Sequence, residues 1–440
     1  MISQEKISPV NLFDQHGPLQ CIQAHTYVYI YNGLGSPLTD FPFFLSFYLS
    51  ISISSLSPIR THLNPQPNMH YQRMDIEKES PEEVGAVIRY NLSESAISDQ
   101  TLQSLNISIP SDLVLTYTEH QGSSPIRSVV AEASNGTLTA NDVLVTAGAS
   151  TSLFIVATAL LGPKDHLVVT RPNYATNLET PRAIGCDTTI IDLEFDSQFR
   201  LSVDQIAAAI RPGVTKLISI CSPNNPTGTV VPAGQLRDLA ALARSHGCYL
   251  LIDETYIDLT YPHSGESLPA AASLGDHVIG VSSMSKAYGV PGIRVGWLST
   301  TSPALQESFL AAKEQISISG SVLDELVAEQ ILARREERLT STRAEMQRRR
   351  DQIAAWIEAE SEFLEWIQPE AGVMCFVKMK KVPQGGTDAF YHRLLLDHGA
   401  YVGPGRWFER PDTYFRLGFG WPSNEELEEG LKAISKALRG

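Results

Sequence analysis

The sequence predicts an α/β protein with a mainly parallel sheet in a large domain and a smaller α+β domain after it. The chain has 440 residues, which exceeds the usual size of a single hydrophobic core. From about residue 142, short runs rich in β-branched residues alternate with helical patterns. Alternation of this kind is typical of parallel strands joined by helices that cover both faces of a sheet.

The strand-like runs are rich in Val, Ile and Leu, as expected for strands that are covered on both faces. They lie at residues 143–148, 166–172, 189–195, 216–223, 249–254 and 277–283. In open sheets of this kind, ligands bind where the carboxyl ends of the strands meet their loops. The loops after these runs are therefore the place to search for a functional site.

The C-terminal part has a different pattern. A long amphipathic helix is predicted at 322–359, followed by strand-like pieces at 373–379 and 414–419 and a last helix at 425–438. We therefore predict four parts. They are an N-terminal extension of uncertain structure (1–70), a segment that packs with the small domain (71–110), a large domain (111–321) and a small C-terminal domain (322–440).

Composition excludes several classes of protein. The formal net charge of −15 argues against a nucleic-acid partner, because phosphate binding needs a basic surface. The number of cysteines, five, is odd, which excludes a complete disulfide framework. They include no CxxC pair, so no metal site is predicted, and a reducing compartment, the cytoplasm, is expected.

The apolar stretch 41–59 is short for a spanning helix and is interrupted by Ser and Pro. It is a loosely attached extension, a membrane anchor or sequence absent from the mature protein. A membrane partner is the less favoured of these interpretations.

Four of the strand-like runs end in loops whose residues suit one chemistry. Small residues at 147–151 open a helix, where backbone N–H groups can bind an anion, although such turns are more often simple connections. The segment 224–228 (NNPTG) is a rigid turn that can also present amide groups to a ligand. The segment 253–256 (DETY) places a carboxylate at a strand end, and 283–286 (SMSK) places a lysine among small hydroxyl residues.

In this order and spacing, together with Arg294 and the segment 415–418 (FRLG), these motifs resemble the class I/II aminotransferases of the fold-type I pyridoxal-5′-phosphate (PLP) enzymes. The resemblance runs from about residue 90 to the C-terminus, and it implies the fold of this family, with a mainly parallel seven-stranded sheet in the large domain. It implies a PLP cofactor bound to Lys286 as a Schiff base, with the same lysine moving the substrate's α-proton. It also implies that Asp253 holds the ring nitrogen protonated, and that Asn225 and Tyr256 contact the ring's 3′-oxygen.

The resemblance also implies where the other groups bind. Arg416 would clamp the substrate's α-carboxylate, with Asn225 beside it. Tyr117 would reach the cofactor phosphate of a neighbouring subunit, which implies a homodimer with shared active sites. The residues expected at the phosphate and the ring of the cofactor are Ala149, Ser150, Ser283, Arg294 and Tyr174.

The chain departs from many members of this family at 92–96 (LSESA), where those members have a Gly-Glu-Pro-like stretch that touches the substrate. Glu94 is therefore a candidate contact to the substrate's side chain that would favour a basic amino acid. The alternative is that it caps or solvates the following turn.

Three functions fit the resemblance. The first is transamination between an amino acid and a 2-oxo acid. The second is elimination, replacement or cyclisation, as in enzymes similar to capreomycidine synthase. The third, a PLP-binding regulator fused to a helix-turn-helix, is disfavoured because residues 1–70 show no basic helical pattern.

Overall fold

The computed structural model describes residues 25–26, 49–50, 69–261 and 268–440. The chain divides into two units, Met1–Gln66 and Pro67–Gly440. In the first unit, the described strands β1 (His25–Thr26) and β2 (Leu49–Ser50) pair antiparallel. Apart from β2, the apolar stretch 41–59 lies outside the described residues, so its interpretation stays a prediction.

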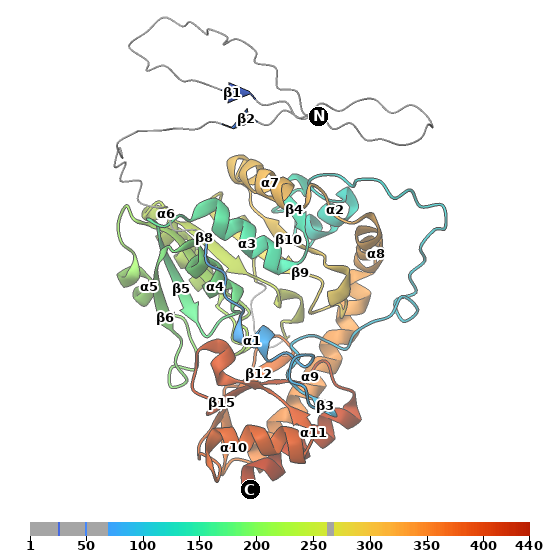
Figure 1. Ribbon diagram of the computed structural model, residues 1–440, viewed down its shortest axis with the longest axis vertical. Helices are drawn as coiled ribbons and strands as arrows, with labels where there is room; N and C mark the ends of the chain where they lie inside the picture. The colour runs from blue at the N-terminus through green and yellow to red at the C-terminus, as the bar shows by residue number, and fades with distance from the viewer. Residues whose placement is uncertain (1–24, 27–48, 51–68, 262–267) are drawn as a thin grey trace, which may run out of the picture. The chain divides into compact units, whose positions relative to one another are not determined.

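The second unit contains a seven-stranded sheet with the strand order β4-β10-β9-β8-β7-β5-β6 (Figure 1). β10 runs antiparallel to both of its neighbours, and the other four pairings are parallel. This confirms the predicted fold class. The strands are β4 (Val143–Thr146), β5 (His166–Arg171), β6 (Asp187–Asp192), β7 (Thr215–Cys221), β8 (Tyr249–Asp253), β9 (Val278–Ser283) and β10 (Gly296–Ser299).

Apolar side chains on both faces of the sheet explain why its strands read as continuous apolar runs. On β7, Leu217 packs in a core with α3 and α7, whereas the next residue, Ile218, packs in a core with α6. Successive residues of a strand point to opposite faces, so both faces are covered by helices. The helices of this part are α2 (Ser124–Glu132), α3 (Ala149–Leu160), α4 (Thr176–Ile184), α5 (Val203–Ala209), α6 (Ala233–Ser245), α7 (Pro303–Ser317) and α8 (Val322–Leu332).

The C-terminal part forms a second, antiparallel sheet with the order β11-β12-β15-β14. β3 (Tyr90–Asn91), from the segment before the large sheet, pairs in parallel with β13 (Ala400–Tyr401). How the chain divides into domains beyond this stays a prediction. The remaining elements of this part are α9 (Arg335–Ala359), β11 (Leu364–Trp366), β12 (Met374–Met379), α10 (Gly386–His392), β14 (Gly403–Pro404), β15 (Tyr414–Gly418) and α11 (Asn424–Arg439).

The single helix predicted at 322–359 is wrong, because α8 and α9 are separate helices. Arg334, at the break, has a non-helical ψ of 30°. Its guanidinium donates to the carbonyl of Leu105 at 3.0 Å, and Arg335 pairs with Asp258. Both arginines bind groups from distant parts of the chain. The spacing of apolar residues does not predict such contacts.

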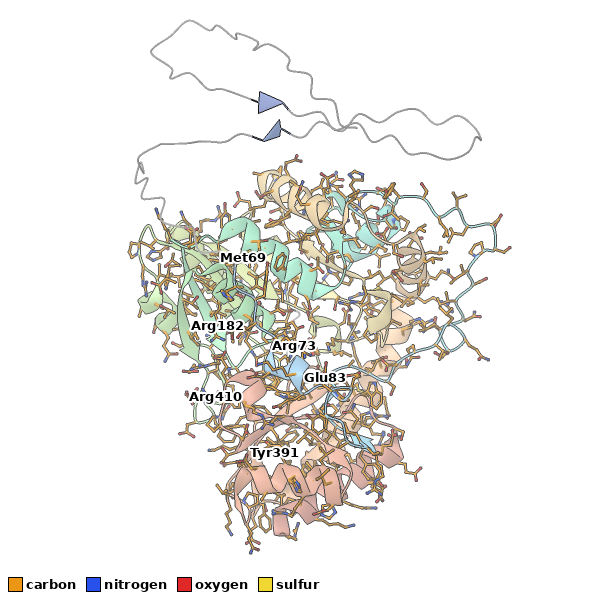
Figure 2. The ribbon with its side chains drawn as sticks, in the orientation of Figure 1. Met69, Arg73, Glu83, Arg182, Tyr391 and Arg410 are labelled. Atoms are coloured by element: carbon orange, nitrogen blue, oxygen red, sulfur yellow. The ribbon has the colours of Figure 1, made fainter. Side chains whose placement is uncertain are left out.

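The short helix α1 (Asp75–Lys78) lies between the two sheets in Figure 1. Glu79, its C-cap residue, accepts a hydrogen bond from Trp407 Nε1 at 2.8 Å, and its carbonyl accepts one from the Tyr401 hydroxyl at 2.7 Å. Arg73 and Glu83, labelled in Figure 2, form an ion pair of 2.9 Å that joins the two sides of α1. These contacts fasten α1 to the small sheet and its loops.

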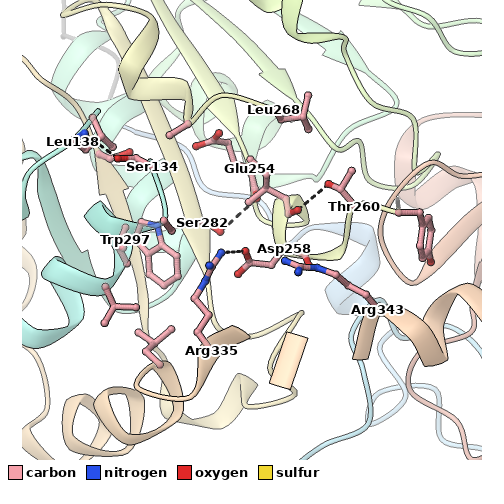
Figure 3. Close-up of a pocket in the computed structure, with 18 residues that line it drawn as sticks. Ser134, Leu138, Glu254, Asp258, Thr260, Leu268, Ser282, Trp297, Arg335 and Arg343 are labelled. Carbon is pink, nitrogen blue, oxygen red and sulfur yellow. Dashed lines mark hydrogen bonds and ion pairs between the residues drawn. The ribbon is translucent and has the colours of Figure 1, made fainter. Parts of the chain in front are cut away.

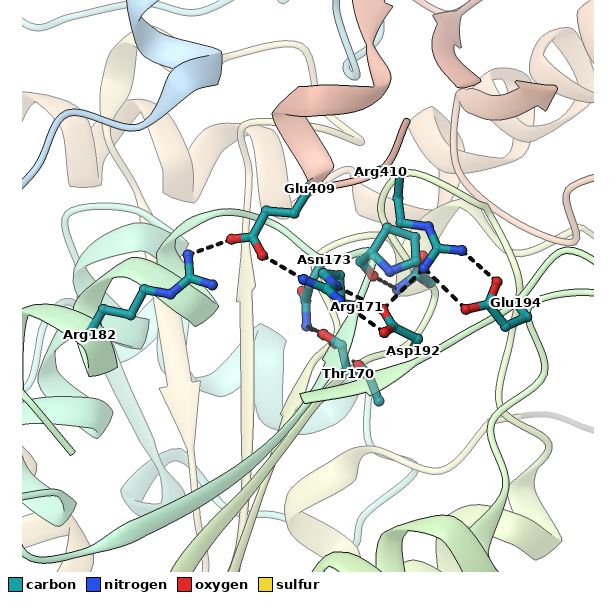
Figure 4. Close-up of polar contacts among 10 residues, drawn as sticks. Thr170, Arg171, Asn173, Arg182, Asp192, Glu194, Glu409 and Arg410 are labelled. Carbon is teal, nitrogen blue, oxygen red and sulfur yellow. Dashed lines mark hydrogen bonds and ion pairs between the residues drawn. The ribbon is translucent and has the colours of Figure 1, made fainter. Parts of the chain in front are cut away.

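A network of ion pairs joins β5 and β6 to the loop after η7 (Gly405–Phe408), as Figure 4 shows. Asp192 accepts from Arg171 at 2.7 Å and from Arg410 at 3.0 Å. Glu409 pairs with Arg171 at 2.9 Å and also with Arg182. Single exposed ion pairs contribute little, but a connected network between two parts of a chain restrains their relative position. Among the described residues, every helix is too short or too polar to cross a membrane.

Candidate active site

A cavity of about 240 Å³ opens where the carboxyl ends of the parallel strands face the small sheet. Its wall combines the loops after β4, β5, β7, β8 and β9 with α1, the segment 93–95 and two residues of the C-terminal part. The residues that line it include Glu77, Ser93, Glu94, Ser95, Ala149, Ser150, Tyr174, Cys221, Asn225, Asp253, Thr255, Tyr256, Ser283, Ser285, Lys286, Arg294, Trp407 and Arg416.

Lys286 follows β9 and extends into the cavity. Its Nζ donates to the Ser95 hydroxyl at 3.2 Å. Burial lowers the pKa of the Lys286 amine, and the nearby Glu94 carboxylate opposes this shift. A lowered pKa increases the neutral fraction of the amine, which is the form that attacks a carbonyl carbon or accepts a proton.

Asp253, the last residue of β8, is 3% exposed. One carboxylate oxygen accepts from Thr255 N at 3.1 Å and from Thr255 Oγ1 at 2.6 Å, and the other has a long contact of 3.4 Å to Asn177 Nδ2. Burial raises the pKa of Asp253, and these hydrogen bonds oppose the shift. A buried carboxylate with an under-used oxygen suits a cationic partner such as a protonated ring nitrogen.

The N-terminus of α3 forms a cradle with Arg294. The N-cap residue Gly148 has φ +85°, and a Cβ there would lie 2.5 Å from Arg294 Nη2. A Cβ on Gly296 would lie 2.8 Å from the backbone nitrogen of Ala149, so both glycines keep the cradle open. Because no side chain caps α3, its first N–H groups and the Arg294 guanidinium provide the donors that a phosphate requires.

Arg416, on β15, is 4% exposed and has no carboxylate partner among the described residues. It donates to Asn225 Oδ1 at 3.2 Å and to the carbonyl of Ser93 at 2.6 Å, while its Nε has no partner. Its guanidinium carbon lies 5.7 Å from the centre of the Trp407 ring and 5.2 Å from that of Phe408. A buried guanidinium held by neutral groups and aromatic rings is suited to bind an anion from outside the chain.

Two tyrosines complete this wall. The Tyr256 hydroxyl donates to the carbonyl of Ser95 at 3.0 Å, and burial raises the pKa of this phenol, so it stays protonated. The Tyr174 hydroxyl lies 3.1 Å from Ser150 Oγ, above the N-terminus of α3. Both side chains line the cavity and can contact a ring bound in it.

Eleven of the twelve predicted site residues line this one cavity. The exception is Tyr117, which is 75% exposed in the loop between β3 and α2. The site also contains five residues to which the sequence assigns no role: Glu77, Ser95, Thr255, Asn177 and Trp407. Thr255 lies inside the DETY motif and could have been found there, whereas no motif marks Glu77.

A second cavity, of about 370 Å³, is lined by residues of α2, β9, β10 and the segment after β8 (Figure 3). Its charged groups are satisfied within the chain, because Asp258 pairs with Arg335 and its carbonyl accepts from Arg343 Nε at 2.7 Å. Glu254 accepts from Ala271 N at 2.9 Å, and burial raises the pKa of this carboxyl to about 8. These pairings fit a structural role. Among the described residues, no cluster of side chains could hold a metal ion.

Known proteins resemble this chain over most of its length. The model of the family described as "Aminotransferase class I and II" matches residues 111–434. A capreomycidine synthase from Streptomyces vinaceus is 30% identical over 67% of this chain and 74% of its own length. An arginine–pyruvate transaminase from Pseudomonas aeruginosa is 29% identical over 72% of this chain and 81% of its own length.

A solved PLP-dependent aminotransferase from Streptococcus suis superimposes with a TM-score of 0.77 and 29% identity, covering 84% of this chain and 98% of its own. The family uses PLP, and the amine, the buried carboxylate and the cradle described above fit that cofactor. The chain therefore belongs to the class I and II aminotransferases, with the α/β fold and the PLP cofactor of that family.

Proposed function

We propose that this chain is an aminotransferase that moves an amino group between an amino acid and a 2-oxo acid, with Lys286 as the residue that binds PLP covalently. One observation carries the proposal. The Lys286 amine and the buried guanidinium of Arg416 line the same cavity, together with the buried carboxylate of Asp253. These groups match an α-amino acid and a protonated pyridine ring.

Different groups of the described residues bind different parts of the cofactor. The cradle of Ala149, Ser150, Ser283 and Arg294 holds the phosphate, Tyr174 stacks on the ring, and Asn225 and Tyr256 contact its 3′-oxygen. Asp253 keeps the ring nitrogen protonated, because a cation beside this carboxylate offsets the cost of its burial. When bound, PLP supplies an electron-withdrawing ring that stabilises negative charge at the substrate's α-carbon.

The remaining residues position the substrate and move its proton. Arg416 binds the α-carboxylate through charge-assisted hydrogen bonds, and Asn225 fixes the guanidinium from the side. This orients the α-hydrogen toward Lys286. Once its amine is free, Lys286 removes that proton and returns it elsewhere on the bound molecule, helped by its lowered pKa.

The exposed loop around Tyr117 supports a homodimer with shared sites. Val114 and Leu115 are each 73% exposed and Tyr117 is 75% exposed, although all three are large apolar or aromatic residues. A second copy of the chain that covers this loop would bury them and bring Tyr117 to the phosphate of the partner subunit.

A second candidate function is elimination, replacement or cyclisation at the same site, which the similarity to capreomycidine synthase favours. Both functions begin with removal of the α-proton by Lys286, so the residues described above do not separate them. They differ in where the amino group finishes.

Borohydride reduction of the purified protein, followed by peptide mass analysis, tests the covalent role. The pyridoxyl mass should appear on the peptide that contains Lys286, and the exposed Lys216 serves as the control position. The mass on another lysine, or a protein that stays colourless with added PLP, would contradict the proposal. Amino acid added without a 2-oxo acid should then convert the cofactor to its pyridoxamine form. Turnover without that form would instead indicate the second function.

A further inference from the structure

Six charged side chains line the active-site cavity, and the proposed function uses four of them: Asp253, Lys286, Arg294 and Arg416. The other two are Glu77, on α1, and Glu94. Neither carboxylate has a hydrogen bond or an ion pair with any residue that the structure describes. In the proposed complex each of the four has a counter-charge or a covalent partner, and the two glutamates have none.

Glu94 lies between the two residues that contact the reacting groups. Ser93 accepts a hydrogen bond from Arg416 through its carbonyl, and Ser95 accepts one from Lys286 through its hydroxyl. Arg416 binds one substituent of the substrate's α-carbon, and Lys286 acts on two others. Because Glu94 lines the same cavity, its carboxylate is available to the remaining substituent, the side chain.

Glu77 reaches the same cavity from a different part of the chain. Glu79 fastens α1 to Trp407 and Tyr401, and Trp407 in turn packs on the Arg416 guanidinium. Burial lowers the pKa of both Lys286 and Arg416, and the negative charges of Glu77 and Glu94 oppose this shift at both residues. Glu94 is half-buried and Glu77 is exposed, and both carboxylates line this one cavity.

The buried guanidinium of Arg416 on the same lining points independently to a charged ligand. Arg416 is 4% exposed, and its Nε has no partner within the described chain. The same cavity thus provides a cation for an α-carboxylate, Arg416, and two further carboxylates, Glu77 and Glu94. Arg294 is the only other arginine of the described lining and belongs to the phosphate cradle, so the lining offers no second guanidinium to an acidic side chain.

We propose that Glu77 and Glu94 form a subsite for a cationic side chain, a guanidinium or an ammonium group, and that this chain acts on basic amino acids. The proposal rests on the proposed function. The two carboxylates attract the cation and form charge-assisted hydrogen bonds with it, and they repel acidic substrates.

L-arginine and L-citrulline test this subsite, because they have nearly the same shape and differ in charge. In the holoenzyme, the ratio of kcat/KM for L-arginine to that for L-citrulline should be at least about tenfold, the loss expected when one charge-assisted contact is absent. Glu94→Gln and Glu77→Gln should each lower that ratio several-fold. Glu82→Gln is the matched control, since Glu82 is an exposed glutamate of the same segment outside the cavity, and should leave the ratio unchanged.

Binding of δ-guanidinovalerate and δ-ureidovalerate, which lack the amino group, gives a readout that does not depend on turnover. Calorimetry should show tighter binding of the guanidino compound to the wild type and loss of that preference in both variants. If L-arginine and L-citrulline react equally and the two analogues bind equally, the subsite proposal is wrong, but the proposed aminotransferase function is not contradicted. If the analogues are distinguished but no amino acid reacts, the subsite stands and the proposed reaction fails.

Discussion

The two walls of the active-site cavity are built in different ways. The wall proposed for the cofactor consists mainly of loops that directly follow β4, β7, β8 and β9, whose ends meet at one edge of one sheet. The wall proposed for the substrate joins α1, the segment 93–95 and the strand β15. Arg416 and Ser93, which are hydrogen-bonded there, are 323 residues apart. The first wall follows from topology, and the second depends on how two sheets pack.

This difference explains what the sequence could predict. Residues such as Asp253 and Lys286 follow recognisable strands, so parallel topology alone brings them together. Arg416 was found through its flanking motif. Glu77 was not found, because α1 has four residues and no apolar pattern, and its position depends on contacts of Glu79 with Trp407. No local signal in the sequence records such a contact.

The fold shows the same division. Six strands were located from their Val-, Ile- and Leu-rich runs, whereas β10 has only four residues, begins with Gly296 and lacks that composition. The break between α8 and α9 was missed because Arg334 and Arg335 continue a helical pattern of charges. In both places a long-range contact, strand pairing or an arginine bound to a distant loop, overrides the local pattern.

Among changes to either wall of the cavity, loss of Lys286 should reduce turnover the most. Lys286→Ala should still bind PLP through the other contacts but lose turnover by several orders of magnitude, because no other amine of the described chain lines the cavity. Absorbance of the bound cofactor and steady-state rates measure the two effects. Lys216→Ala, at an exposed site on the opposite end of the sheet, is the control. If Lys286→Ala turned over at a rate near that of the wild type, Lys286 would have no essential role in the reaction.

Asp253→Asn tests the role proposed for the Asp253 charge in the cofactor wall. The amide keeps the shape and a hydrogen bond but loses the charge that holds the ring nitrogen protonated, so turnover should fall about 10²–10³-fold. PLP affinity should change much less. Titration with PLP and measurement of kcat separate the two effects, with the exposed Asp238→Asn as the control. An unchanged kcat would mean that Asp253 only orders the turn at Thr255.

Arg416→Lys tests the substrate wall. An ammonium group cannot reproduce a two-point contact with a carboxylate, so KM for the amino acid should rise about tenfold or more. PLP affinity should stay close to the wild type, since Arg416 lies outside the phosphate cradle. Arg348→Lys, an exposed change on α9, is the control. Equal KM values in the two variants would assign the α-carboxylate to another residue.

The smallest expected effect concerns Glu254, which follows Asp253 directly but lines the second cavity. The pKa of this carboxyl rises from 4.5 to about 8 through burial, so the folded chain keeps a proton that the unfolded chain releases. Stability from this group is complete below about pH 4.5 and is lost as the pH rises toward 8, by up to about 1.4 kcal/mol per unit.

Glu254→Gln retains an acceptor for Ala271 N and cannot ionise, so its unfolding midpoint in urea should depend less on pH between about 5.5 and about 7.5. Titrating groups that do not interact with Glu254 act equally in both proteins, so the difference between the two slopes reports Glu254 and its coupling to Asp253 and Asp258. Parallel slopes would show that Glu254 is ionised in the folded chain, and that the second cavity is open enough to hydrate its charge.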